Sequence, residues 1–112
     1  MIVQRLEIDV LRGGEVEFEA VLLEVRQRAF MAAGFRGFTV AQNVERPSSY
    51  LVQVRWETLD EVAEFVDSCR FERCWAPVEP FLAVPLRVEH FAERPGLDFQ
   101  GPGVITDLQW TT

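Results

Sequence analysis

Hydrophobic residues near the start of the chain recur with two different periods, and this change limits the fold more than any other feature. In residues 2–10 one set of alternate positions is apolar apart from Gln4, and the set between them is mainly charged. This alternation predicts a β-strand with one mainly apolar face. After Gly13 and Gly14 the apolar residues recur every three or four positions, which predicts an amphipathic helix with Gly34 as its C′ stop. The apolar residues of this helix are Phe18, Val21, Leu22, Val25 and Ala29.

Four further elements follow this helix. Residues 35–44 and 49–56 are predicted strands, and the turn-forming residues 45–48 between them predict an antiparallel hairpin. Thr58 and Glu61 have the spacing of a capping box, which predicts the start of a second helix. A short helical piece is expected over residues 71–76, ended by Pro77, and residues 81–91 are expected to form the last strand.

The order of these elements is βαββαβ, which predicts an α+β fold of the ferredoxin-like class. Right-handed crossovers place both helices on one face of a four-stranded antiparallel sheet with strand order 4-1-3-2. At 112 residues the chain is expected to form one domain, over residues 1–91. Residues 92–112 form a C-terminal extension that is rich in Gly and Pro and then apolar, and we expect it to pack on the body or on a partner subunit.

Composition excludes several classes of function. The formal net charge of −7 argues against nucleic acid as a partner, because phosphate binding needs a concentrated positive field. All eleven basic residues are Arg, so there is no Lys for Schiff-base or P-loop chemistry. Cys69, Cys74 and the single histidine, His90, are too few and too poorly spaced for a metal site. No segment has the ~20 apolar residues that span a bilayer, and residues 1–11 lack a signal-peptide pattern, so a soluble cytoplasmic protein is expected.

Several short motifs, in their order along the chain, resemble the antibiotic biosynthesis monooxygenase (ABM) domain. They are G-F-x-G at 34–37, E-R-P at 45–47 followed by Y-L-V-x-V-x-W-E at 50–57, F-x-x-S-x-x-F-x-x-x-W at 65–75, P-F at 80–81 and E-H-F at 89–91. The resemblance covers residues 2–91. It implies a dimeric α/β barrel with a substrate pocket inside each subunit, between the helices and the sheet. The family it points to includes cofactor-free oxygenases of polyketide quinols, quinol monooxygenases and haem-degrading enzymes.

The haem-degrading branch fits the sequence poorly. By motif alignment, Gln4, Phe65 and Trp75 stand where that branch has an Asn, a Trp and a haem-ligating His. A tryptophan offers only an N–H donor and cannot ligate iron. We therefore expect no haem, and without a dinucleotide glycine motif or a metal-ligand set we expect no cofactor at all.

The resemblance and the residue types together give a set of candidate site residues. His90, Gln4 and Trp75 are the candidate catalytic residues, since an imidazole can take a proton near neutral pH and an amide can hold a substrate hydroxyl. The candidate substrate-pocket residues are Trp56, Phe65, Phe81, Gln42 and Asn43. Two interpretations remain open: a monooxygenase of an aromatic or polyketide-like quinol or phenol, and a non-catalytic small-molecule-binding or stress-associated dimer. The aromatic residues would equally serve as core packing, and His90 as a structural hydrogen-bonding residue.

The second face of the predicted sheet carries both signs of charge. Its residues are Arg5, Glu7, Asp9, Gln53, Arg55, Glu57, Arg87 and Glu89. Such a face is either solvated and crossed by weak ion pairs or a self-complementary surface. Because helices on one side leave the other side open, we expect a homodimer through the sheet faces. Pro85 in the last strand is taken to indicate an edge position.

Overall fold

The computed structural model describes residues 1–99 and contains nine elements. They are β1 (Ile2–Asp9), α1 (Glu15–Phe30), β2 (Phe35–Gln42), β3 (Ser49–Trp56), α2 (Leu59–Asp67), α3 (Arg70–Trp75), the 3-10 helix η1 (Ala76–Phe81), β4 (Arg87–Ala92) and the 3-10 helix η2 (Pro95–Leu97). The predicted βαββαβ order is confirmed, with α2 and α3 as the two parts of the second helical segment.

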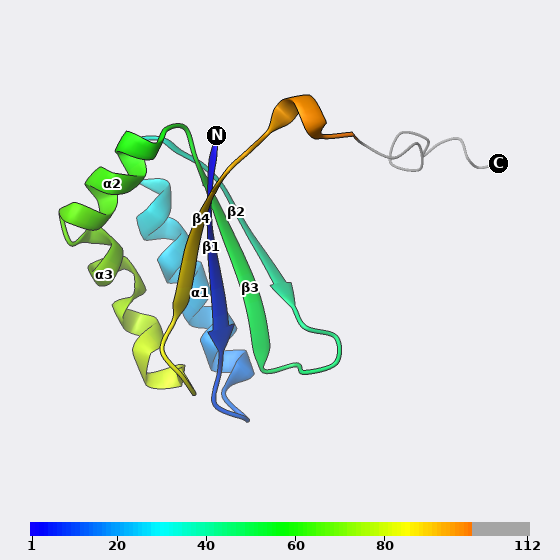
Figure 1. Ribbon diagram of the computed structural model, residues 1–112. Coiled ribbons are helices and arrows are strands. Elements are labelled where there is room, and N and C mark those ends of the chain that lie inside the picture. Colours follow the sequence, from blue (N-terminus) through cyan, green and yellow to red (C-terminus); the bar gives the residue numbers. More distant parts are fainter. Residues whose placement is uncertain (100–112) are drawn as a thin grey trace.

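The four strands form one antiparallel sheet in the order β2-β3-β1-β4, as predicted. In register, Gln4 of β1 lies between Val54 of β3 and His90 of β4, and Arg5 lies between Gln53 and Glu89. The helices α1, α2 and α3 all lie on one side of the sheet, and its other side is uncovered in the monomer (Figure 1). The fold is therefore a two-layer α+β sandwich of the ferredoxin-like class.

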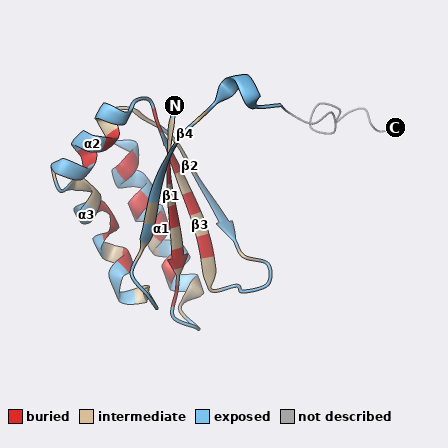
Figure 2. Cartoon of the chain, viewed as in Figure 1, coloured by how far each residue is buried: buried red, intermediate tan, exposed pale blue. Residues whose placement is uncertain are grey.

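The core lies between the sheet and the helices. Alternate residues of β1 and β3 are buried against α1 and α2, whereas most of the edge strands β2 and β4 is exposed (Figure 2). The buried side chains of the two central strands are Gln4, Leu6, Ile8, Tyr50, Val52, Val54 and Trp56. Gln4 is the single buried polar residue among those described. The helix-facing side thus combines an apolar interior with one amide near its centre.

The start of α2 confirms the predicted cap. The Glu61 backbone N–H donates to Thr58 Oγ1 at 3.2 Å, and the Thr58 hydroxyl donates to the Glu61 carboxylate at 3.1 Å. Gly34 has a φ of +86°, but α1 has already ended at Phe30 with Met31 as its C-cap. Gly34 therefore reverses the chain immediately before β2, and its prediction as the C′ residue of the helix is wrong.

The predicted boundaries of two strands are also wrong. The last strand begins at Arg87 and not at residue 81, because residues 76–81 form η1, which contains Pro77 and Pro80. A single bridge joins Val10 to Leu82, and Pro85, which has no N–H for a ladder bond, lies before the strand. β4 is an edge strand as expected, although Pro85 is not part of it.

β2 ends at Gln42 and not at residue 44. The Asn43 side chain accepts the N–H groups of Glu45 and Arg46, both at 2.8 Å, and so starts the turn.

Residues 93–99 lead away from the body after β4 (Figure 1). Glu93 is held against the open face by Arg55, whose Nε and Nη2 donate to its carboxylate at 2.9 and 3.1 Å. Leu97 and Phe99 are 80% and 89% exposed. Residues 100–112 lie outside the described part, so the expected packing of the C-terminal extension stays a prediction. No helix among residues 1–99 has the length and apolar content of a membrane span.

Candidate functional site

The polar centre of the helix-facing side is a pair of side chains from neighbouring strands. Gln4 is 1% exposed, and its Nε2 lies 3.0 Å from Nε2 of His90. The amide N–H donates to the imidazole nitrogen, which in the neutral ring leaves the proton on Nδ1. The two residues are direct partners in the β1–β4 register, so the backbone itself fixes their approach. Two of the predicted catalytic residues are thus brought together.

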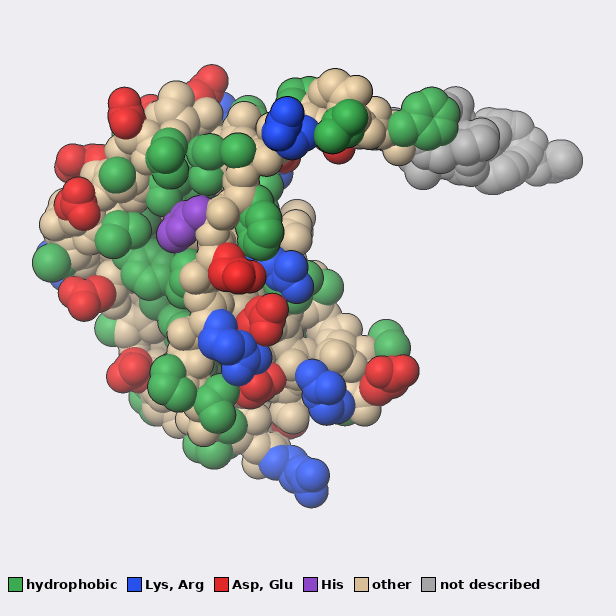
Figure 3. Space-filling model, in the orientation of Figure 1, with side chains coloured by type: hydrophobic (Ala, Val, Ile, Leu, Met, Phe, Trp, Pro, Cys, Tyr) green, Lys and Arg blue, Asp and Glu red, His purple; other side chains and the backbone are tan. Residues whose placement is uncertain are grey.

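His90 connects this buried amide to the surface. It lies on β4, the edge strand, and its side chain is exposed although it faces the helix layer. Figure 3 shows the single histidine in a region of hydrophobic side chains between the helices and β4. A molecule approaching from this side would meet the imidazole first and the amide of Gln4 behind it.

Trp56 of β3 lies diagonally across from Gln4 on the helix-facing side, and a chain of aromatic rings from α2, α3 and β2 continues from it. We call Phe38, Trp56, Phe65, Phe71 and Trp75 the aromatic cluster. Ring centroids of Trp56 and Phe65 are 4.9 Å apart, and those of Phe65 and Phe71 are 6.4 Å apart. Trp75 lies 6.4 Å from Phe71 and is stacked on Phe38 at 6.4 Å with an interplanar angle of 18°. Three predicted residues, Trp56, Phe65 and Trp75, therefore belong to one continuous cluster.

The indole of Trp56 contains an unexpected free donor. Its side chain is fully buried, and its Nε1 has no hydrogen-bond acceptor among the described residues. A buried N–H without an acceptor costs about 1–3 kcal/mol, so such groups are rare in folded proteins. Sequence reasoning assigned Trp56 only an aromatic wall, because the hydrophobic period shows that a residue is buried and not what its polar atom meets.

A hollow opens at the rim between the helix layer and the start of β4. Its volume is about 290 Å³, and it is lined by Phe71, Glu72, Trp75, Ala76, Glu79 and Leu86. We call it the rim hollow. Phe71 and Trp75 of the aromatic cluster form its inner wall. Leu86 precedes β4, and Val88 and His90 follow it at alternate positions on the helix-facing side. Leu86 at the edge of the rim hollow therefore lies about 13 Å along the chain from His90, at about 3.3 Å per residue.

Phe81 lies apart from this region. Its ring is 6.4 Å from Phe18 of α1, and Phe18 is in turn 4.8 Å from Tyr50 of β3. This second aromatic group occupies the opposite end of the sandwich, near the end of β1. The Tyr50 hydroxyl donates to Glu19 at 2.5 Å, and burial followed by this bond to Glu19 raises the pKa of Tyr50. Tyr50 is therefore not a source of phenolate near neutral pH.

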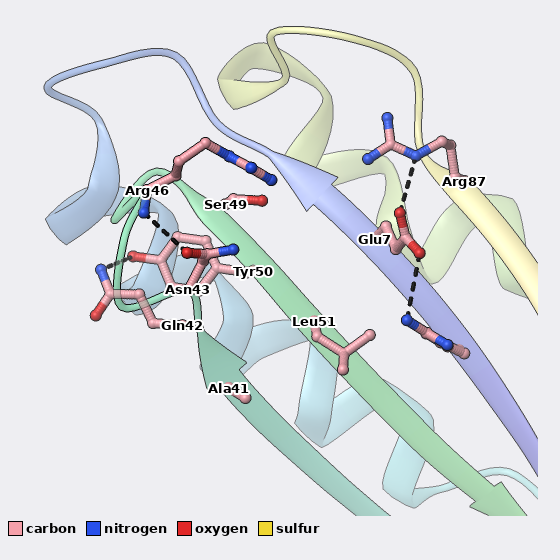
Figure 4. A pocket seen from close by; sticks show the side chains of 10 residues that line it. Glu7, Ala41, Gln42, Asn43, Arg46, Ser49, Tyr50, Leu51 and Arg87 are labelled. Carbon is pink, nitrogen blue, oxygen red and sulfur yellow. Dashed lines mark hydrogen bonds and ion pairs between the residues drawn. The ribbon is translucent and has the colours of Figure 1, made fainter.

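Gln42 and Asn43 lie at the β2–β3 turn and not beside Gln4. Gln42 Nε2 donates to the Pro47 carbonyl at 2.7 Å and to the Tyr50 hydroxyl at 3.3 Å, and both residues line a hollow of about 360 Å³ (Figure 4). The lining residues are Arg5, Glu7, Ala41, Gln42, Asn43, Arg46, Ser49, Tyr50, Leu51 and Arg87. Gln42 pairs with Tyr50 in register, four residues along β3 from Val54, which is about 13 Å from the level of Gln4.

Cys74 and the acidic side chains of residues 1–99 form neither a thiolate nor a metal site. Burial raises the pKa of the Cys74 thiol to about 11, so it is protonated near neutral pH. Within residues 1–99 no three side chains of the His, Cys, Asp or Glu type gather as a metal site would require. The rim hollow can therefore hold an aromatic molecule against Phe71 and Trp75, and the imidazole of His90 is open to a molecule at the surface, whereas the amide of Gln4 and the indole N–H of Trp56 lie buried in the interior.

Comparison with known proteins gives one family and a set of related structures. Residues 1–76 match the model of a family described as antibiotic biosynthesis monooxygenase. A candidate antibiotic biosynthesis monooxygenase from Bordetella bronchiseptica is similar in structure, with 29% sequence identity and a TM-score of 0.73 over 83% of this chain and 97% of that chain. Among curated proteins no significant match was found.

Two further structures resemble the chain at lower identity. One, a candidate antibiotic biosynthesis monooxygenase from Deinococcus radiodurans, has 11% identity and a TM-score of 0.75 over 90% of this chain and all (100%) of that chain. The other is SnoaB, a cofactor-independent oxygenase from Streptomyces nogalater, with 17% identity and a TM-score of 0.69 over 83% of this chain and 93% of that chain. At these identities the likeness shows the fold alone.

Proposed function

Because the chain belongs to the antibiotic biosynthesis monooxygenase family, we propose that it is a cofactor-independent monooxygenase of an aromatic or polyketide-like quinol or phenol. The observation that carries the proposal is the pair formed by Gln4 and His90, a buried amide joined to an exposed imidazole beside the aromatic cluster. Such a combination of apolar walls with few polar groups is the usual composition of a small-molecule site.

The proposed reaction needs no added reductant. A hydroquinone and O₂ give a hydroxyquinone and water: one oxygen atom replaces a ring hydrogen as a hydroxyl group, and the other leaves as water. All four electrons that reduce O₂ come from the substrate, which loses two to form the new C–O bond and two to become a quinone. The protein then has to position the substrate, accept its proton and exclude competing solvent.

The residues of the site have separate roles in this proposal. The substrate hydroxyl first displaces the amide N–H of Gln4 from Nε2 of His90, and that nitrogen then takes the hydroxyl proton. Imidazole suits this role because its ordinary pKa is near neutrality, and a phenolate is a better electron donor than a phenol. Gln4 holds the resulting oxygen through its amide N–H. The indole N–H of Trp56 is a second donor, and Phe71 and Trp75 of the rim hollow provide the first aromatic surface that the substrate meets.

Oxygen uptake tests this function directly. The protein is mixed anaerobically with substituted hydroquinones and naphthoquinols, and O₂ is then added while its consumption is followed with an electrode. We expect a rate above that of the quinol alone, one O₂ consumed per hydroxyquinone formed, and loss of that excess in His90→Gln. Arg12→Gln, on the surface outside the site, is the control variant. An uptake rate equal to that of the protein-free reaction for all quinols would contradict the proposal.

One observation favours a second candidate, a non-catalytic small-molecule-binding or stress-associated protein. Gln4 and His90 satisfy each other, and the rings of the aromatic cluster are in mutual contact, so apart from the indole N–H of Trp56 this interior needs no ligand. A protein of this kind would bind the same aromatic compounds at the rim hollow. Quinol binding measured by quenching of tryptophan fluorescence, together with unchanged oxygen consumption, would support it.

We also propose that the chain acts as a homodimer through the uncovered sheet face, the arrangement that makes a dimeric α/β barrel. The described ion pairs of this face support the proposal, because opposite charges alternate across it: Arg87 contacts Glu7 and Asp9, both at 3.2 Å, and Arg55 contacts Glu93. A two-fold axis brings such a patch against its own copy, where opposite charges can meet. The C-terminal extension, residues 92–112, is proposed to pack on the partner subunit.

A further inference from the structure

Three arginine side chains border one hollow on the outer surface, between α1 and α3. Arg28 comes from α1, Arg70 and Arg73 come from α3, and the fourth lining residue is Cys74. The hollow has a volume of about 270 Å³. We call it the arginine hollow. On α3 the residues at 70, 73 and 74 have the three- and four-residue spacing of one helix face, whereas Phe71 and Trp75 line the rim hollow.

Two of the three guanidinium groups are held in place by the fold. Arg28 Nη1 donates to the backbone carbonyl of Arg73 at 2.9 Å, which ties the end of α1 to α3. The guanidinium carbon of Arg70 lies 5.5 Å from the ring centroid of Phe65, in a cation–π contact. Side chains fixed in this way lose less conformational entropy when they bind a ligand than free surface arginines do.

The positive charge of the hollow is not neutralised within the described chain. The carboxylates of residues 1–99 that form ion pairs do so with Arg5, Arg36, Arg55 and Arg87. Arg28, Arg70 and Arg73 make no ion pair with any described residue, although the formal net charge of the chain is −7. Their field reaches the floor of the hollow, because Arg28 and Arg70 both act to lower the pKa of Cys74 against the larger effect of burial.

We propose that the arginine hollow binds an oxyanion of the phosphate class, either inorganic phosphate or the phosphate group of a monoester. A planar guanidinium offers paired N–H donors that match phosphate oxygens, and three of them around one hollow can neutralise a dianion. The site is on the opposite face of α3 from the rim hollow and does not depend on the proposed oxygenase reaction.

Solution NMR at constant ionic strength tests this proposal. Chloride is replaced stepwise by inorganic phosphate in one series and by glycerol 3-phosphate in a second, while the amide and Arg Nε–H signals of ¹⁵N-labelled protein are followed. We expect saturable shifts confined to α3 and the end of α1. Equal affinity in both series assigns the site to free phosphate, and tighter binding of the ester assigns it to a phosphorylated metabolite.

Two variants separate binding from folding. Arg73→Gln keeps the backbone carbonyl that Arg28 contacts, so it removes one charge without touching a described contact of the fold. We expect it to weaken phosphate binding about tenfold, and Arg70→Gln/Arg73→Gln to weaken it further. Arg94→Gln, outside the hollow, is the charge-matched control and should bind as the wild type does. Linear, unsaturable shifts, or equal affinities in Arg73→Gln and Arg94→Gln, would show that the hollow is not an anion site.

Discussion

Gln4 is an amide on a sheet face whose next positions, Leu6 and Ile8, are fully buried and apolar. At this position a leucine would satisfy the core at least as well, because a buried polar group must regain in hydrogen bonds what it loses in hydration. The single described partner of the amide is His90, which water can also reach. The proposed substrate oxygen, which would accept the same N–H, gives this buried amide a role that stability alone does not require.

Replacing this amide separates the two explanations. Gln4→Leu should change the free energy of unfolding by less than about 1 kcal/mol, because exposed His90 can bond to water in its place. The same change should lower the quinol-dependent oxygen uptake at least about tenfold, a loss of about 1.4 kcal/mol of transition-state stabilisation. Urea unfolding and the oxygen electrode give the two values. Gln27→Leu, at an exposed position of α1, is the control. If the amide were purely structural, Gln4→Leu would instead destabilise the fold and leave the oxygen uptake unchanged.

Asp9 provides a residue-scale prediction about pH. Its carboxylate accepts the Ser49 hydroxyl at 2.8 Å, and this bond is the largest cause of its lowered pKa, with Arg87 contributing as well. A carboxyl whose pKa is lower in the folded than in the unfolded chain stabilises the fold above its unfolded pKa, about 3.9, and loses that contribution as the pH falls through its folded pKa.

Ser49→Ala should accordingly raise the pKa of Asp9, measured by NMR titration of its side-chain carbonyl carbon. The stability difference between wild type and Ser49→Ala should be larger at pH 7 than near pH 2. Ser48→Ala, the neighbouring turn serine, whose side chain makes no described hydrogen bond, should leave the pKa of Asp9 unchanged. An Asp9 pKa that is identical in the wild type and Ser49→Ala would contradict the assigned cause.

At the scale of elements, the join between α1 and β2 depends on a glycine packed against α2. Gly34 has a φ of +86°, and an added Cβ would lie 2.9 Å from Cβ of Glu61 and closer still to its carboxylate. Gly13 has a similar φ of +92°, but an added Cβ there would meet nothing within 4 Å. The two glycines thus differ in their surroundings and not in their backbone conformation.

Replacing each glycine by alanine measures the loss of stability from backbone strain alone at Gly13, and from strain together with the clash against Glu61 at Gly34. Gly13→Ala should destabilise the fold by about 1–2 kcal/mol, the strain of a left-handed residue with a Cβ. Gly34→Ala should cost at least about 1 kcal/mol more, because Glu61 must move from the cap of α2. Thermal unfolding gives both values. In a Glu61→Ala background the additional destabilisation by Gly34→Ala should be smaller. Equal destabilisation by Gly34→Ala and Gly13→Ala would show that Glu61 moves aside without a loss of stability.

The sequence predicted the elements well where one period continues over many residues. β1, α1 and β3 follow their apolar stripes, and Thr58 marks the start of α2. It failed over residues 76–86, where Pro77, Pro80 and Pro85 interrupt any period and residues 76–81 form η1. For the site, the period placed Gln4 on the inner face, but it could not show which end of the sheet Phe81, Gln42 and Asn43 would reach. That depends on strand register and on the path of η1, which are tertiary features.

At the scale of the whole molecule, the proposed homodimer forms through the uncovered sheet face. Arg55 lies on this face and is already paired within its own chain to Glu93. A carboxylate at position 55 would repel Glu93 as well as any acidic group of a partner subunit. The charge change therefore acts both on the interface and on the segment that follows β4.

We expect Arg55→Glu to raise the dissociation constant of the dimer about a hundredfold or more, because like charges at an interface oppose association. Size-exclusion chromatography with light scattering at micromolar concentration measures the mass. Arg26→Glu, the same change on the helical side, should leave the assembly intact. A wild-type monomer of 12.9 kDa would rule out the dimer, and an Arg55→Glu dimer of unchanged affinity would rule out the charged-face explanation.

The short helix α3 lines two hollows with its two faces: Phe71 and Trp75 at the rim hollow, and Arg70 and Arg73 at the arginine hollow. A rigid piece of six residues cannot move at one face without moving at the other. If a ligand at either hollow shifts α3, binding at one hollow changes the affinity of the other. This effect is reciprocal: an oxyanion changes the affinity for a quinol by the same factor as the quinol changes the affinity for the oxyanion. One helix would then make the proposed oxidation responsive to the concentration of phosphate around it.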